Sequence, residues 1–229
     1  MSGAPQEQTG FLYPFLEAEE RDADALLADL ARSADAKAAE SIRLRIASLE
    51  RCGAQLDEVG QAIAERFAAG GRMFTFGNGG SATDAAGLAL LFTRPPRGSP
   101  LPARSLVSDE SILTALSNDI GFDVVFSRQL IAHARGGDIA VGLSTSGNSE
   151  NVIRAFEEAR RRDLLTVGLA GYEGGAMGAC ADLQHCIIVR ADSVHRIQES
   201  QAAIGYVLWE RVQAALDERV TAATAKDDR

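Results

Sequence analysis

The sequence predicts an α/β protein whose core is a five-stranded, mainly parallel sheet in an α/β/α sandwich, preceded by N-terminal helices. Two observations indicate this fold class. From residue 72 onward, short apolar runs alternate with segments of helical periodicity, as in strand–helix–strand units. Before residue 70, a long stripe of apolar residues instead recurs at helical spacing. Because parallel strands are joined by crossover helices, we expect helices on both faces of the sheet.

Two helices are expected before the first strand, over residues 17–33 and 37–69. In the second, apolar residues recur every three, four or seven positions until Gly70 and Gly71 interrupt the pattern. A stripe of this length is typical of a helix bundle or an oligomer interface. The apolar residues 11–16 also need a surface on which to dock, such as another subunit.

The alternating region contains the sheet. We expect strands at 73–76, 103–107, 139–143, 165–169 and 186–189, and helices near 81–92, 110–118, 122–134, 149–162 and 195–217. The chain then divides into a tail and helix over residues 1–34, one domain over 35–217, and a flexible polar tail over 218–229. In open parallel sheets, ligands bind beyond the carboxyl ends of the strands.

Composition argues against several classes of function. The 23 basic and 32 acidic residues give a formal net charge of −9, which disfavours nucleic acid and acidic membrane surfaces as partners. The lysines, Lys37 and Lys226, are distant from the loops described below, so a Schiff-base or P-loop lysine is not available. No apolar run reaches the length of a membrane span, no signal-peptide pattern is visible, and the three cysteines lack CxxC spacing. We therefore expect a cytoplasmic protein.

A serine-rich loop follows the apolar run at 139–143 and precedes a helix. Its hydroxyl residues are Ser144, Thr145, Ser146 and Ser149. At such a junction, unpaired backbone N–H groups, hydroxyl donors and the positive end of the helix dipole converge, which favours an anion such as a phosphate. The alternative is that Ser149 only caps the helix and the rest is a polar loop.

A glycine-rich loop, Gly-Asn-Gly-Gly-Ser at 77–81, follows the first strand in the same way. Its glycines permit positive φ and a close approach of a ligand to the backbone, and Ser81 is a suitable N-cap. The third glycine of a dinucleotide-binding fingerprint is missing, so a Rossmann cofactor is not expected. After the second strand, Asp109 is either a helix cap, which is the commoner role, or a carboxylate that binds hydroxyl groups. On the last helix, Gln198 and Glu199 could meet a ligand or simply be solvated.

Taken together, these motifs resemble those of the sugar isomerase (SIS) domain family, and most closely its phosphoheptose isomerase branch. The matching segments are 77–81, 108–109, 113–122, 126–128, 144–149, 171–175 and 196–199. The resemblance implies a homotetramer, or at least a homodimer, with sites between subunits, and aldose–ketose isomerisation of sedoheptulose 7-phosphate. It also implies phosphate binding by Ser144, Thr145, Ser146 and Ser149, and sugar contacts from Asn78, Ser81, Asp109 and Gln198.

The sequence departs from the family at the four positions that bind zinc in its enzymes. The corresponding residues are Gly87, Leu91, Gln198 and Tyr206, of which Gln198 alone keeps the family's ligand. Because glycine and leucine can neither bind a metal nor move a proton, we expect no metal and no cofactor. The family's base is replaced by Leu91, and the remaining candidates for catalysis are Glu199, His195 and Tyr206.

Two functions follow, and the sequence leaves both open. The first is a phosphosugar isomerase, or a related enzyme, with altered catalysis. The second is a non-catalytic sensor of a phosphorylated sugar, or a scaffold for another protein. Because the helix after the glycine loop lacks the metal ligands, the chain also resembles stand-alone relatives associated with hydrogenase maturation. Whether the chain is an enzyme therefore depends on how its acid and base groups are arranged.

Overall fold

The computed structural model describes residues 23–227. The helix before the sheet is α1, which runs from Ala23 to Ala68 as one element. The prediction of two helices with a break near residues 34–36 was wrong, because the connecting residues Ser33, Ala34, Asp35 and Ala36 include neither glycine nor proline. The apolar residues 11–16 and the predicted start of the first helix lie outside the described residues.

The chain divides into two compact units, residues 1–42 and 43–229. In the first unit, the described residues are helical and expose Leu27, Leu30 and Ile42 to solvent. In the second, the last helix α7 extends from Val194 to Asp227, beyond the predicted end at 217. The part predicted to be a flexible tail is thus helical as far as Asp227, since residues 218–227 contain no helix breaker. The domain limits at 34 and 217 stay predictions.

The strands and the remaining helices occur in the predicted order. The strands are β1 (Met73–Gly77), β2 (Ala103–Ser105), β3 (Ile139–Ser144), β4 (Leu165–Gly171) and β5 (His185–Val189). The helices are α2 (Gly80–Thr93), α3 (Glu110–Asp119), α4 (Val125–His133), α5 (Glu150–Arg161) and α6 (Gly175–Gly178), with a 3-10 turn at Phe122–Val124. The short helix α6 was not predicted, and β2 ends two residues early because it is an edge strand paired only with β1.

The five strands form one sheet in the order β2-β1-β3-β4-β5, and all neighbours are parallel. The predicted α/β/α fold class is thereby confirmed. The chain moves from β1 outward to β2 and then returns to the other side of β1 with β3, so the strand order reverses between β1 and β3. In doubly wound sheets, the crevice beyond such a switch point is where ligands bind.

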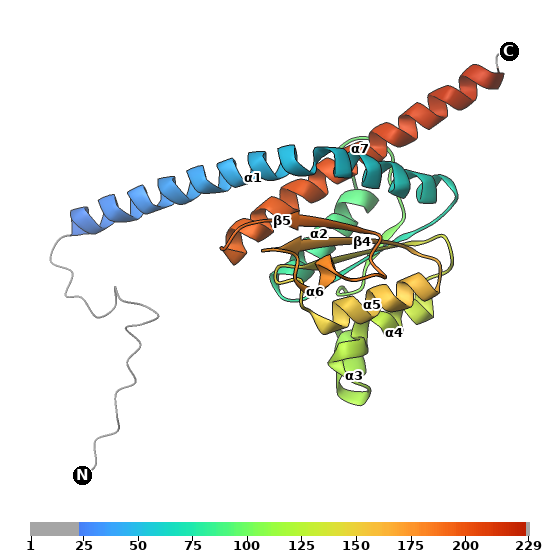
Figure 1. The fold of residues 1–229 in the computed structure, drawn as a ribbon, viewed down its shortest axis with the longest axis horizontal. Helices are drawn as coiled ribbons and strands as arrows, with labels where there is room; N and C mark the ends of the chain where they lie inside the picture. Colours follow the sequence, from blue (N-terminus) through green and yellow to red (C-terminus); the bar gives the residue numbers. More distant parts are fainter. Residues whose placement is uncertain (1–22, 228–229) are drawn as a thin grey trace, which may run out of the picture. The chain divides into compact units, whose positions relative to one another are not determined.

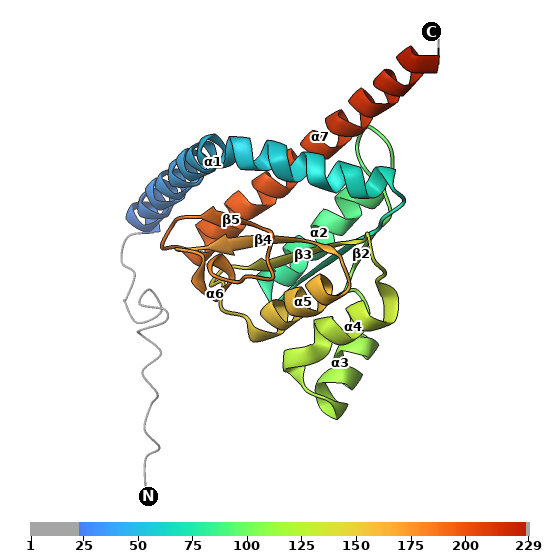
Figure 2. The same cartoon turned by 45° about the vertical axis from the view of Figure 1, so that its right-hand side comes forward.

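Side chains alternate between two apolar layers. Along β1, Met73 belongs to the layer under α2, α7 and the end of α1, whereas Phe74 and Phe76 face α4 and α5. Helices α2 and α7 lie on one side of the sheet and α4 and α5 on the other (Figure 1 and Figure 2). The ring of Phe76 packs against Phe156 of α5, with centroids 5.5 Å apart. A side chain at Gly142 of β3 would collide with both rings, so glycine is required there.

Within residues 23–227, no helix combines the length and the apolar character needed to span a membrane.

Candidate functional site

The strand order brings the glycine loop and the serine loop together. Strands β1 and β3 pair directly, and Gly77 at the end of β1 lies opposite Leu143, one residue before the serine loop. Neighbouring strands are about 4.8 Å apart, so the loops leave the sheet side by side. Helices α2 and α5 both begin at this edge, with Gly79 and Ser149 at their N-cap positions. Two helix N-termini therefore flank the switch point.

Two asparagines join the loops. The side-chain amides of Asn78 and Asn151 exchange two hydrogen bonds, with N···O distances of 2.8 and 3.0 Å. Asn151 lies in the first turn of α5 and is 3% exposed. Its role was not predicted, although an amide in the first turn of the helix after a serine loop is a signal visible in the sequence. The pair sets the spacing of the two loops and holds Asn78, a predicted sugar-binding residue, in a defined orientation.

Two hydroxyl groups of the serine loop, those of Ser144 and Ser149, form a hydrogen bond. The Oγ atoms of Ser144 and Ser149 are 2.9 Å apart, and the Gly147 N–H donates to Ser144 Oγ at 3.2 Å. Ser146 Oγ accepts from the Asn148 N–H at 3.2 Å. Although Ser149 occupies the N-cap position, its hydroxyl makes no capping bond to the described part of α5. Of the two predicted roles for Ser149, side-chain capping is therefore not the one adopted.

The serine loop is supported from beneath by the turn that contains α6. The Met177 N–H donates to Gly147 O at 2.9 Å, and the Ala176 N–H donates to Asn148 Oδ1 at 2.8 Å. Gly147 has φ 68°, and a Cβ added there would lie 2.0 Å from the carbonyl oxygen of Gly174. Only glycine fits this contact, so the path of the loop is fixed by backbone packing. This support was not predicted from the sequence.

In the glycine loop, Gly79 rather than Ser81 occupies the N-cap position of α2. The N-cap expectation for Ser81 was wrong, because the positive φ of Gly79 starts the helix two residues earlier. Ser81 lies within the first turn and is 3% exposed. The Gln198 side chain reaches the loop from α7, since a Cβ on Gly80 would lie 1.9 Å from Gln198 Nε2. Gln198 and the glycine loop are thus in close contact.

Asp109 caps α3. Its Oδ1 atom accepts a hydrogen bond from the Ile112 N–H at 3.1 Å. Two residues before Asp109, Val107 lines a cavity of about 450 Å³ beside the glycine loop. Capping is thus the visible role of Asp109, and its predicted contact with a sugar stays a prediction.

A second cavity of about 450 Å³, here called the α2–α7 hollow, shares Thr83 of α2 with the first. It is lined by Thr83, Asp84, Gly87, Leu88, Leu91, Leu143, Leu169, Gln201, Ala202, Gly205 and Tyr206. Most of this lining is apolar. Burial raises the pKa of the Asp84 carboxyl above its usual range, and Asp84 Oδ2 has no hydrogen-bond partner within the described chain.

The α2–α7 hollow contains three of the four positions that the family resemblance equates with zinc ligands. These are Gly87, Leu91 and Tyr206, while Gln198 lies against the glycine loop. A glycine and a leucine offer no donor atom, so these residues do not fit the family's zinc. Across residues 23–227, no three His, Cys, Asp or Glu side chains gather closely enough to hold a metal ion.

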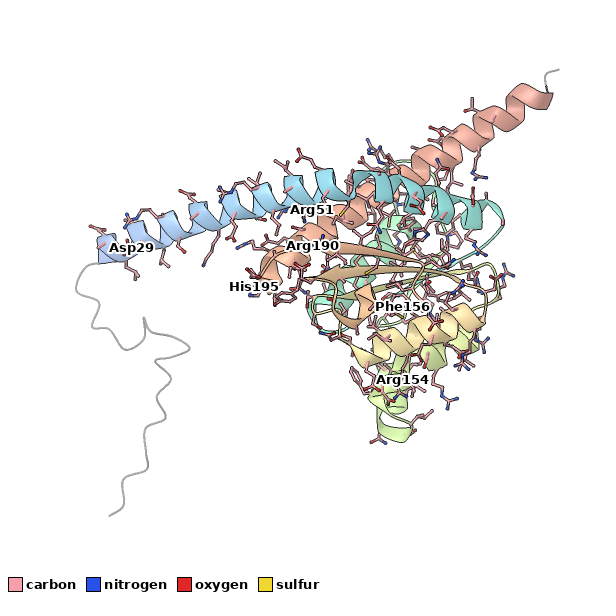
Figure 3. All side chains as sticks on the ribbon, in the orientation of Figure 1. Asp29, Arg51, Arg154, Phe156, Arg190 and His195 are labelled. Carbon is pink, nitrogen blue, oxygen red and sulfur yellow. The ribbon has the colours of Figure 1, made fainter. Side chains whose placement is uncertain are left out.

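The three predicted catalytic residues all lie on α7, in different surroundings. Tyr206 lines the α2–α7 hollow and packs on Trp209, with ring centroids 5.2 Å apart. Glu199 forms ion pairs with Arg196 and, at 3.7 Å, with Arg45. His195 is exposed in the first turn of α7 (Figure 3). Two guanidinium groups therefore hold the Glu199 carboxylate, and catalysis by Glu199, His195 and Tyr206 stays a prediction.

Comparisons with known proteins agree with this architecture. The sequence pattern of the SIS domain matches residues 38–171. The phosphoheptose isomerase of Rhodospirillum rubrum is 42% identical over 167 residues, covering 72% of this chain and 88% of that protein. That of Chlorobaculum tepidum is 44% identical over 177 residues, covering 76% and 84%. The structure of phosphoheptose isomerase GmhA from Neisseria gonorrhoeae superimposes with a TM-score of 0.75 at 34% identity, covering 81% of this chain and 99% of that one.

Proposed function

Because the chain belongs to the SIS domain family and is a phosphoheptose isomerase-like member of it, we propose that it binds a phosphorylated sugar of the sedoheptulose 7-phosphate type. The proposal rests on one observation above all. The facing hydroxyls of Ser144 and Ser149, 2.9 Å apart, lie at the strand switch point between two helix N-termini. Hydroxyl donors and helix N-termini together favour a phosphate.

In the proposed complex, the phosphate replaces the bonds that the loop now makes to itself. Ser144 Oγ lies 2.9 Å from Ser149 Oγ and accepts from the Gly147 N–H, so these three groups are already close together, and Thr145 and Ser146 supply further hydroxyls. The glycine loop and Gln198 then contact the sugar, with Asn78 oriented by Asn151 and Ser81 in the first turn of α2. Asp109 would reach the sugar from the start of α3.

Catalysis is proposed to be altered or lost rather than retained in the family's form. An isomerase needs a base beside the carbon that loses its proton and a group that stabilises the developing oxyanion. Apolar residues occupy two of the corresponding positions, Gly87 and Leu91, and the structure offers no zinc donors there. This observation favours the second candidate function, a non-catalytic phosphosugar sensor or scaffold, of which a role in hydrogenase maturation is one form.

We further propose a cytoplasmic homotetramer, with a homodimer as the alternative. In the first unit, α1 exposes Leu27, Leu30 and Ile42, and in the second unit Ile46 is also exposed. Apolar side chains repeated along one helix are typical of an oligomer interface. The three cysteines are free thiols, which suits a reducing compartment. Light scattering of the full chain would measure its oligomeric state.

The double variant Ser144→Ala, Ser149→Ala tests phosphate binding. We expect sedoheptulose 7-phosphate to raise the melting temperature of the unmodified protein and to leave that of the double variant unchanged. Ser33→Ala, an exposed serine of α1, is the matched control and should respond as the unmodified protein does. An undiminished shift in the double variant would show that the anion binds elsewhere. Turnover of the sugar, assayed with and without added zinc, separates the isomerase from the sensor.

A further inference from the structure

A third cavity, of about 200 Å³, lies at the edge of the sheet opposite the serine loop. Its lining includes Met73 and Ala103, the first residues of β1 and β2, whereas the glycine and serine loops follow the ends of their strands. Because β1 has five residues and a strand rises about 3.3 Å per residue, the two edges are about 16 Å apart. This space, here called the strand-start cavity, is therefore separate from the proposed phosphate site.

Strand alternation and register place two arginines on one face of the sheet. Arg72 directly precedes β1 and continues its pairing with β3, since its carbonyl accepts from the Ile139 N–H at 2.8 Å. Its guanidinium group lies over the ring of Phe74, two residues on, at 5.6 Å from the centroid. Arg104 of β2 is the register partner of Phe74 and so shares this face. Helix α4 ends there at His133, which with both arginines lines the cavity.

Positive charge exceeds negative charge around the cavity. Arg72 Nη2 donates to Asp138 Oδ2 at 3.0 Å and to the His133 carbonyl at 2.8 Å, which fixes the guanidinium group. The buried Asp138 is shared with Arg135, whose Nε lies 4.0 Å from Oδ1. Arg104 is exposed and forms no ion pair with a described residue. Three arginines and one carboxylate thus leave an excess of about two charges, in a chain with a net charge of −9.

The cavity also has an unused donor nearby and an apolar wall. Arg72 Nε is buried and has no hydrogen-bond partner within residues 23–227, although such donors are costly to leave unpaired. Met73, Phe74 and Pro102 supply apolar surface, and no Asp or Glu is among the described residues of the lining. Since a water molecule occupies about 30 Å³, the space holds about seven groups of that size. It therefore suits a small organic acid and is too small for a nucleotide.

We propose that the strand-start cavity binds a small organic anion, with its carboxylate or phosphate group between Arg72 and Arg104 and its short carbon body against Phe74 and Pro102. Such a site is additional to the one in the proposed function and does not depend on it. Guanidinium groups bind the oxygens of either acid through paired N–H donors. Because Asp138 already holds Arg72 in place, binding costs little side-chain entropy at that residue. The excess of positive charge favours a dianion over a monoanion.

The test uses the full chain carrying Ser144→Ala and Ser149→Ala, so that the serine loop does not contribute to anion binding. It is titrated by calorimetry with succinate and with inorganic phosphate, at constant ionic strength. We expect saturable binding that Arg104→Gln weakens by about tenfold or more, because a charge-assisted hydrogen bond is lost. This variant should fold normally, since Arg104 is exposed and has no described ion pair to lose. Arg160→Gln is the matched control, because Arg160 is an exposed arginine in the last turn of α5 and does not line the cavity.

The two probes distinguish the sources of the anionic group. Binding of succinate alone would identify a carboxylate, and binding of phosphate alone a phosphate ester or phosphate. Either result supports the proposal when Arg104→Gln weakens binding and Arg160→Gln does not. Equal weakening by both variants would show a general effect of charge and would overturn it, as would unchanged affinity of Arg104→Gln or a lack of saturable binding of both anions. Each of these results leaves the proposed function standing, because that function is tested with sedoheptulose 7-phosphate at the serine loop.

Discussion

Gly147→Ala is the substitution whose effect on the serine loop follows most directly from the geometry. Gly147 has φ 68°, in the left-handed region that residues with a Cβ rarely adopt. An added Cβ would lie 2.0 Å from Gly174 O, 2.6 Å from Gly174 C and 3.1 Å from Gly175 N. All three atoms belong to backbone, so no flexible side chain can move aside. Since real Cβ contacts are essentially never below 3.0 Å, the loop must shift by about 1 Å or more.

A shift of that size breaks the hydrogen-bonding geometry of the groups proposed to bind the anion. The Gly147 N–H and the hydroxyls of Ser144 and Ser149 converge through distances of 2.9 to 3.2 Å, a range that tolerates little displacement. A hydrogen bond to a charged group contributes about 1.5–3 kcal/mol, so losing one weakens phosphate binding by about 10- to 150-fold. The left-handed backbone of the alanine variant should also lower the free energy of unfolding by about 1–2 kcal/mol.

Calorimetric titration with sedoheptulose 7-phosphate, at a temperature where the variant is folded, measures the affinity, and a thermal melt measures the stability. Gly53→Ala is the matched control, because a Cβ on Gly53 meets nothing within 4 Å in helix α1. This control should retain wild-type affinity and gain about 0.5–1 kcal/mol of stability. An alanine variant at position 147 that is less stable but binds with wild-type affinity would refute the assignment of the phosphate to this loop.

Three further predictions concern side chains around the hollow and the sheet edge. Because burial raises the Asp84 pKa, the folded state holds that proton more tightly than the unfolded state does, so stability falls as pH rises from about 4 through the raised pKa. Asp84→Asn should therefore melt higher than the unmodified protein at pH 7 but not below about pH 4, and a gain independent of pH would contradict this reasoning. A triple variant that combines Gly87→His, Leu91→Glu and Tyr206→His should bind zinc, whereas the double variants should not. Metal analysis after gel filtration measures this. Tight zinc binding by the unmodified protein would refute the premise that its own residues do not hold the metal. Burial raises the pKa of Cys186 to about 11, so iodoacetamide should modify it at pH 8 at least about 100-fold more slowly than a thiol of ordinary pKa, and fast modification in the folded protein would oppose this.

The alternation of strands and helices was predictable because each element has its own hydrophobic pattern within a short stretch of sequence. Apolar runs such as that of β3 and the amphipathic pattern of α5 depend on neighbouring residues alone. The order of the strands was not predictable in this way, since the pairing of Gly77 with Leu143 joins residues far apart in the sequence. The fold class was therefore correct, while the switch point that unites the two loops emerged only from the structure.

The site shows the same division between local and long-range information. The serine loop was predicted because its hydroxyl residues are clustered directly before a helix. The bonds between Asn78 and Asn151, and the support of Gly147 by the turn around α6, cross between elements and leave no local pattern. Ser149 illustrates the limit, since its N-cap position suggested capping, whereas its hydroxyl bonds to Ser144 instead.

In this fold, the groups proposed to bind a phosphate are physically separate from the positions that the family resemblance equates with metal ligands. The proposed phosphate site is formed mainly by the backbone. It comprises the two loops and the helix N-termini, and the contact of Gly147 with Gly174 supports it. The positions equated with metal ligands, Gly87, Leu91 and Tyr206, are side chains on the flanks of α2 and α7. Replacing them leaves the helices and the loops on their paths, so a chain can lose the metal without losing the phosphate site. The absence of metal donors at Gly87 and Leu91 is therefore compatible with the proposed binding of a phosphorylated sugar.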